Sequence, residues 1–320
     1  MLRTLIVATL SMAHCGKDPA APATMSDRAA LEAMASVERL LDAGRHAEAL
    51  RAAETLQRAR ARDPLAAEML GRARMAAGAS PASIAEAFAM AADLDPVSPG
   101  LQSAAGVTAA ATGSWSEALR RAEAASRLQP GNPQHDFHRA IALRRLGRSR
   151  DALQAARTVR QRLPMDPAVR IELAECELAC GDVDAALADA RAAVALERAA
   201  AATRVAAADV ARRCGALDDA VALLMPLVGS GEPSVLVAVA ECHGLAGRHD
   251  ESARWWERAA AAPAAGWMAC AGACRAHAAA GDTRQALAWL AACRERGAPA
   301  WEVEALERHL ALPRVGDLSK

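Results

Sequence analysis

The sequence predicts an all-α protein: an α-solenoid of about eight helix–turn–helix repeats that ends in a single capping helix. Two observations predict this fold class. A glycine recurs about every 34 residues along most of the 320-residue chain, a period typical of stacked repeats. The composition is rich in Ala, Leu, Arg and Glu, which favour helix, whereas Tyr is absent and only 2% of the residues are aromatic. Sheet cores draw on aromatic and β-branched side chains, so this composition argues against a β-protein.

The repeating unit is marked by a glycine that is followed, five and six residues later, by a small residue and usually an apolar one. The unit around Gly113, Ala118 and Leu119 is typical. Self-similarity at a fixed period of this length is the signature of stacked repeats. The members of the series are almost evenly spaced, and the shortest step is the one that ends at Gly247: Gly44, Gly78, Gly113, Gly147, Gly181, Gly215, Gly247 and Gly281.

Each unit is expected to form two helices that meet at its glycine. An amphipathic stretch of about three turns precedes the glycine, as in Ala168–Cys180. The glycine can adopt the positive φ that ends a helix. A second helix begins directly after it, and Ser114-Trp115-Ser116-Glu117 has the spacing of a capping box. In four units this second helix ends before a proline that lies at nearly the same distance beyond the glycine: Pro96, Pro130, Pro164 and Pro299.

These features resemble the tetratricopeptide repeat over about residues 29–311, with the solenoid itself expected over residues 29–299. The turn glycine, the small residue five positions later and the closing proline all match that family. Leu94-Asp95-Pro96 and Leu128-Gln129-Pro130 are similar to its closing signature. The resemblance implies a right-handed superhelix whose first helices line a concave groove that binds a protein or peptide. The chain departs from the family in its large aromatics, because Trp256 is the one clear aromatic at the second-helix place.

Residues 1–28 precede the repeats and allow two interpretations. Residues 1–15 hold one arginine and a short apolar run before Cys15, and they resemble a bacterial lipoprotein signal in which Cys15 carries the lipid. Residues 16–28 then form a polar linker. However, His14 departs from the small residue usual at that place, and Met25 opens a chain that enters helix at once. A lipid-anchored envelope protein and a cytosolic protein that starts at Met25 both remain open.

Two places along the repeats are expected to differ from the rest. Pro226 falls inside the expected second helix of the sixth unit, Leu217–Gly229, where it removes a hydrogen bond and clashes with the preceding turn. We therefore expect an irregular helix there. At the end of the chain, Trp301–Ala311 repeats a first helix without its partner. Residues 300–311 are thus expected to cap the solenoid, and residues 312–320 to form a tail.

Charge and motifs exclude several classes of function. The 38 Lys and Arg balance 38 Asp and Glu and the isoelectric point is near 7.1, so the overall charge gives no footprint for nucleic acid. No run of apolar residues is long enough to span a membrane, which leaves a lipid anchor as the only expected membrane contact. G-x-S-x-G, G-x-G-x-x-G and P-loop motifs are missing, so we expect neither an enzyme nor a cofactor.

The cysteines have a functional and a structural interpretation. Cys270, Cys274 and His277 share one helix face at a spacing that can bind Zn²⁺. These places are also inward-packing positions of the repeat, where a free cysteine behaves as a small hydrophobe. We expect core packing and no metal site. The remaining cysteines after Cys15 are expected to be packing thiols as well: Cys176, Cys180, Cys214, Cys242 and Cys293.

The histidines and tryptophans also have two interpretations each. His135 and His138 flank Asp136 at a helix start, where an exposed capping turn is expected rather than a surface metal site. Trp255 and Trp289 recur one repeat period apart, and so do Trp267 and Trp301, which favours a packing ladder over a ligand platform. They are the tryptophans of the last repeats: Trp255, Trp256, Trp267, Trp289 and Trp301.

The remaining candidate site is the groove that the resemblance implies. Counting back from each glycine places six acids on the outward face of the first helices: Glu38, Asp42, Glu68, Glu175, Asp209 and Glu241. Six arginines share that face and are the candidate partner-binding residues: Arg72, Arg144, Arg145, Arg212, Arg213 and Arg275. A guanidinium can hold a carboxylate through two hydrogen bonds. No Asn or Lys stands there, so the carboxylate clamp of some family members is not expected. A solvated, charge-balanced face is the alternative.

We therefore expect a non-catalytic protein-interaction scaffold that binds a peptide or protein in its groove. Arg144, Arg145, Arg212 and Arg213 are the expected anchors, because they form two adjacent pairs. In the lipid-anchored interpretation the chain is similar to repeat lipoproteins that assist outer-membrane, pilus or secretion assembly. In the other interpretation it is a cytosolic adaptor or regulator.

Overall fold

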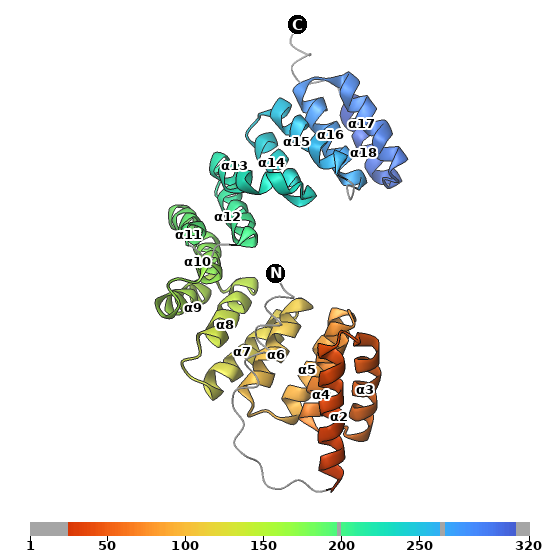
Figure 1. Cartoon of the computed structure of the whole chain (residues 1–320). Coiled ribbons are helices and arrows are strands. Elements are labelled where there is room, and N and C mark those ends of the chain that lie inside the picture. The colour runs from red at the N-terminus through yellow and green to blue at the C-terminus, as the bar shows by residue number, and fades with distance from the viewer. Residues whose placement is uncertain (1–24, 197–199, 263–265, 312–320) are drawn as a thin grey trace. The chain divides into compact units, whose positions relative to one another are not determined.

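The computed structural model describes residues 25–196, 200–262 and 266–311. Within these ranges the chain forms seventeen α-helices and one 3₁₀ helix, with no strand. It divides into two compact units between Pro164 and Met165, and each unit is described by itself. Figure 1 shows the helices as consecutive hairpins within each unit.

The first unit contains four helix pairs. Each helix packs on the next, and first helices also contact each other across a pair, as α2 does with α4 and α6 with α8. The helices are α2 (Met25–Asp42), α3 (His46–Ala59), α4 (Pro64–Ala76), α5 (Pro81–Leu94), α6 (Pro99–Ala111), α7 (Trp115–Leu128), α8 (Pro133–Arg145) and α9 (Ser149–Arg162).

The second unit contains four further pairs and a final unpaired helix, α18, which packs on α16 and α17. Its elements are α10 (Pro167–Ala179), α11 (Val183–Ala195), α12 (Ala201–Arg213), α13 (Leu217–Leu224), η1 (Met225–Ser230), α14 (Pro233–Leu245), α15 (His249–Ala261), α16 (Trp267–Ala280), α17 (Thr283–Glu295) and α18 (Ala300–Ala311). The predicted all-α solenoid is confirmed: each unit contains four of the eight helix pairs, and the terminal helix lies in the second unit.

All eight glycines of the series stand at the turns where the sequence places them, with positive φ from 70° at Gly44 to 93° at Gly281. The turn after α6 shows why. Gly113 donates its N–H to Ala110 at 3.1 Å, and Ser114 donates to Ala109 at 3.0 Å. These bonds satisfy the last carbonyls of the helix, and only a left-handed residue lets the chain reverse in this way.

The starts of the first helices follow a different rule. In α4, α6, α8 and α10 a proline occupies the first turn, and the preceding Asp, Ser or Asn caps the helix through its side chain, as Asp63 does for the Leu65 N–H at 2.9 Å.

The capping box expected at Ser114 is wrong. The Ser114 hydroxyl lies 3.0 Å from the Thr112 hydroxyl and makes no cap bond, and Arg120 and Arg121 hold the Glu117 carboxylate. Because the Ser114 N–H already closes the glycine turn, its ψ is 63° rather than the extended value that a cap needs.

The irregularity expected at Pro226 is confirmed. Helix α13 has only 8 residues and ends at Leu224, and the chain continues as the 3₁₀ helix η1 with Pro226 in its first turn. Proline has no N–H to donate and its ring clashes with the carbonyl four residues earlier, so the α-helix cannot pass through it.

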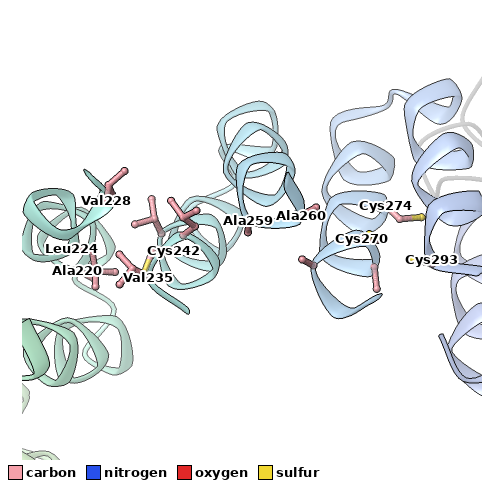
Figure 2. Packing of buried hydrophobic residues seen from close by; sticks show 14 of the residues in the cluster. Ala220, Leu224, Val228, Val235, Cys242, Ala259, Ala260, Cys270, Cys274 and Cys293 are labelled. Carbon is pink, nitrogen blue, oxygen red and sulfur yellow. The ribbon is translucent and has the colours of Figure 1, made fainter. Parts of the chain in front are cut away.

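The cores are built mainly from Ala, with glycines where a large ring crosses a helix. In the first unit a Cβ on Gly71 would lie 2.8 Å from the Phe88 ring. In the second unit Gly272 of α16 similarly leaves room for the ring of Trp256 on α15. Figure 2 shows the second unit's core extending from Ala220 to Cys293 through small and medium side chains. Small residues thus let the helices approach closely.

Candidate functional site

The candidate site consists of charged side chains on the first helices, which we call the first-helix surface. It carries the arginines expected from the sequence on α4, α8, α12 and α16, together with the carboxylates that they contact. Its members, unit by unit, are Glu38, Arg72, Arg144 and Arg145 in the first unit, and Glu175, Asp209, Arg212, Arg213, Arg275 and Glu302 in the second.

In the first unit the arginines are held by neighbouring helices. Arg72 Nη1 of α4 lies 3.3 Å from Glu38 Oε1 of α2, so this pair joins two successive first helices. The guanidinium of Arg145 stands over the ring of Trp115 on α7, 5.3 Å from its centroid. Arg144 also has an interaction partner. Arg144 and Arg145 occupy the last turn of α8, where the helix dipole favours a cation.

In the second unit Arg213 makes the most extensive contact. Its Nη1 lies 2.8 Å and 3.0 Å from the two carboxylate oxygens of Glu175, which joins α12 to α10. Arg212 Nη2 donates to Asp209 Oδ1 at 2.6 Å, one turn earlier on the same helix. This hydrogen bond is the main cause of a raised pKa of Arg212. Arg212 therefore stays charged beside Asp209.

The last member of the surface is Arg275 of α16, which forms an ion pair with Glu302 of α18. The Glu302 side chain is buried while Arg275 is half exposed. Glu302 falls within the capping helix that the sequence predicted, but the sequence did not indicate this pair. Because α18 stands where the next first helix of the series would stand, this contact also joins successive first helices, but here the arginine lies on the earlier helix, whereas Arg72 and Arg213 lie on the later one.

The surface is thus a series of arginine–carboxylate pairs between successive first helices. The pair of Arg72 with Glu38 is partly exposed on both sides, so water screens it and it contributes little stability. The carboxylates of Glu175 and Glu302 are mostly buried, so the rule for exposed pairs does not apply to them. Arg144–Arg145 and Arg212–Arg213 lie in different units, and each pair is a candidate anchor within its own unit.

Five of the seven cysteines after Cys15 are buried, which confirms core packing for them: Cys176, Cys242, Cys270, Cys274 and Cys293. Burial raises the pKa of the Cys274 thiol to about 11 and that of Cys293 to about 12, so both stay protonated at neutral pH. Cys180 is exposed, which corrects the expectation for that residue, because it is the C-cap residue after α10 and stands beside the turn glycine.

The zinc interpretation of Cys270, Cys274 and His277 finds no support in the geometry. His277 Nε2 contacts Glu257 Oε1 of α15 at 2.9 Å. In the part of the chain that the structure describes, no group of three or more His, Cys, Asp or Glu side chains is arranged to hold a metal ion.

The expectation of an exposed turn at His135 and His138 is wrong. His135 is buried, with its Nε2 3.2 Å from both Gln129 and Asn132 in the loop before α8. His138 Nδ1 lies 3.4 Å from the Ser103 hydroxyl of α6, and burial lowers the pKa of His138 to about 4. Both rings are therefore neutral packing groups at physiological pH. The sequence around Pro133 did not predict that the loop before α8 would contact His135.

The tryptophans divide between core and surface. Trp255, Trp256, Trp267 and Trp289 pack against the core of the second unit, whereas Trp301 is 63% exposed. Trp301 nevertheless meets Trp267 edge to face, with ring centroids 6.4 Å apart. The packing interpretation therefore holds for the four tryptophans that contact the core.

Two expectations concern membranes. Cys15, the candidate lipid-bearing residue, lies outside the described residues. Among the helices that the structure describes, none has the length and apolar character needed to cross a membrane.

Comparison with known proteins supports the repeat assignment. The family model described as tetratricopeptide repeat matches residues 34–99, 103–167 and 139–202. A search of the curated proteins gave no match. Among solved structures, a tetratricopeptide repeat protein from Parabacteroides merdae is 14% identical, with a TM-score of 0.53, and the match covers 76% of this chain and 96% of that one.

Two further structures show the same kind of likeness. A chain of the Cut9–Hcn1 hetero-tetramer of the APC/C is 15% identical with a TM-score of 0.56, over 86% of this chain and 53% of that one. The protein TTC0263 from Thermus thermophilus is 22% identical with a TM-score of 0.43, over 57% and 98%. At these identities, the likenesses to the Parabacteroides merdae protein and to the Cut9–Hcn1 chain show the fold alone.

Proposed function

The chain belongs to the tetratricopeptide repeat family, a family of protein-interaction scaffolds, and we propose that it binds an acidic peptide segment of a partner on its first-helix surface. The family is generally non-catalytic, so binding is its expected activity. The observation that carries the proposal is the set of arginines already positioned against carboxylates on α4, α12 and α16.

These pairs support a ligand that carries carboxylates. Arg213 holds both oxygens of Glu175 and so presents the guanidinium edge that a bound carboxylate needs. Arg is the side chain best suited to such contacts, because its planar fork bonds both oxygens. Within one unit, an acidic segment would contact the arginines of that unit's first helices. Each contact adds little, so affinity depends on their number.

The proposal is tested by co-purification of the tagged full chain from native cells, comparing the wild type with a variant in which Arg144, Arg145, Arg212 and Arg213 are all Ala. The expected result is loss of a specific partner from the variant. The control is Arg191→Ala, which removes an exposed ion pair with Asp219 that joins two second helices. Equal partner yield from the variant and the wild type, with both folded, would place the binding surface elsewhere.

A finer proposal concerns the cell envelope. Residues 1–15 resemble a lipoprotein signal, and lipidation of Cys15 would place the scaffold at a membrane, where it would assist assembly or secretion. Mass spectrometry of the native N-terminus tests this: a diacylated Cys15 supports the envelope role, and a chain beginning at Met25 supports a cytosolic adaptor instead.

A further inference from the structure

The charge of the chain is divided unevenly between its two units. Residues 1–164 hold 22 Lys and Arg against 16 Asp and Glu, whereas residues 165–320 hold 16 against 22. The balanced total therefore conceals a basic first unit. The excess concentrates in its last helix pair, because residues 133–162 of α8 and α9 contain eight arginines and only two aspartates.

Both aspartates of this helix pair are already engaged. Asp151 Oδ2 lies 2.7 Å from Arg148 Nη2 at the start of α9. Asp136 Oδ2 lies 3.3 Å from Arg162 Nη1, and its Oδ1 accepts the Ser126 hydroxyl at 3.2 Å. The pair therefore has no carboxylate left to neutralise the other arginines of α9.

Three arginines of α9 remain, and we call them the α9 surface: Arg150, Arg157 and Arg160. All three are exposed, and within the described residues they make no ion pair and no side-chain hydrogen bond. Arg150 and Arg157 are seven residues apart, so they lie on one side of the helix at a separation of about 10 Å. The buried residues of α9 point the other way: Ala152, Ala155, Ala156 and Val159.

The α9 surface differs from the other second helices of the first unit. On α3 acidic and basic side chains alternate, with Glu48, Arg51, Glu54 and Arg58, and on α7 the Glu117 carboxylate holds Arg120 and Arg121. Unpaired like charges on one face repel each other and give no stability to the fold. A bound opposite charge would offset this repulsion.

We propose that the α9 surface is a second interaction site, separate from the first-helix surface, which binds an acidic protein segment. Three adjacent guanidiniums suit a segment that presents two or three carboxylates. Nucleic acid fits less well, because duplex binding commonly uses about 6–10 phosphate contacts and strand binding uses stacking side chains. Helix α9 carries no aromatic residue.

The test measures binding of a short fluorescein-labelled peptide of alternating Glu and Ser to the full chain by fluorescence anisotropy at low salt. The decisive variant is Arg150→Glu with Arg157→Glu and Arg160→Glu. The matched control, Arg51→Glu with Arg58→Glu and Arg62→Glu, changes the net charge equally on and just after α3. We expect affinity to fall at least about tenfold in the α9 variant and much less in the control.

Three results would overturn the proposal. The first is no measurable binding of the peptide, and the second is an equal loss of affinity in the α9 variant and the control. The third is tighter binding of a labelled DNA duplex than of the peptide at the same salt, lost in the α9 variant, which would assign the surface to nucleic acid. A variant with Ala at Arg144, Arg145, Arg212 and Arg213 separates the two sites, because it should retain the binding that the α9 variant loses.

Discussion

Arg213 of α12 reaches the preceding first helix and holds both carboxylate oxygens of Glu175 on α10, at 2.8 Å and 3.0 Å. The sequence placed these residues 38 positions apart on one expected surface, but it did not indicate that they are partners. The Glu175 side chain is 15% exposed and that of Arg213 is 40% exposed, so water screens the guanidinium more than the carboxylate. The two hydrogen bonds fix the position of the Arg213 guanidinium, and because water screens this guanidinium we expect them to contribute little to the free energy of unfolding.

A double-mutant cycle tests this interpretation. With Arg213→Ala, Glu175→Gln and the double variant, we expect a coupling free energy of about 0.2–1 kcal/mol in urea unfolding. A small coupling means that a ligand can displace Glu175. A coupling well above that range would show a structural pair, and Arg213 would then be a poor anchor for a partner.

Gly272→Ala is expected to destabilise the second unit, because its Cβ would press into the ring of Trp256. Overpacking of this kind costs about 1–3 kcal/mol, which exceeds the gain of up to about 1 kcal/mol from replacing a helical Gly by Ala. Urea unfolding measures the difference. Gly266→Ala is the control, since no atom lies within 4 Å of its added Cβ. Adding Trp256→Leu to Gly272→Ala should recover part of the loss, and a stabilised Gly272→Ala would contradict the packing.

The buried thiols predict a loss of stability at alkaline pH. Burial raises the pKa of Cys274 to about 11 and of Cys293 to about 12, whereas an unfolded thiol has a pKa near 8.5. The folded state thus keeps protons that the unfolded state releases, and their contribution is full below about pH 8.5 and lost as the pH rises toward the folded values. The urea midpoint should fall from pH 8 to pH 10, and less so with both cysteines replaced by Ala. An equal fall in both proteins would show that other groups cause it.

His138 predicts the opposite dependence at acidic pH. Burial lowers the pKa of His138 to about 4, below the value near 6.5 of an unfolded histidine. The unfolded state therefore binds the proton first, and the contribution of the neutral ring is full above about pH 6.5 and lost as the pH falls toward 4. The free energy of unfolding should fall over this range, and His138→Gln should flatten the fall. An NMR titration that gives His138 an ordinary pKa would exclude the mechanism.

Thiol labelling separates the one exposed cysteine among the described residues from the buried ones. Cys180 should react readily with iodoacetamide in the native protein, whereas Cys270 and Cys293 should react only after denaturation, because solvent does not reach them. Mass spectrometry of the labelled peptides gives the order. Early labelling of Cys293 would mean that α16 and α17 separate in solution.

The turns, the number of repeats and the break at Pro226 could all be predicted from the sequence. Each depends on a local backbone requirement: a glycine ends a helix with positive φ, and a proline cannot continue one. Because these requirements act within a few residues, the sequence shows them directly, and the repeat period then gives the order of the helices. The candidate arginines could be located in the same way, because a helix position follows from its distance to the turn.

The tertiary structure alone decided which side chains meet. Arg275 pairs with Glu302, His138 meets Ser103, and Trp115 carries Arg145. Each contact joins residues from different helices, and its distance depends on how closely the helices pack, which depends on small residues such as Gly272. Burial follows the same rule: Cys176 lies within α10 and is buried, whereas Cys180, four residues later at the C-cap, is exposed. The sequence determined the helices and their order, and packing between them decided which charges are paired and which remain exposed.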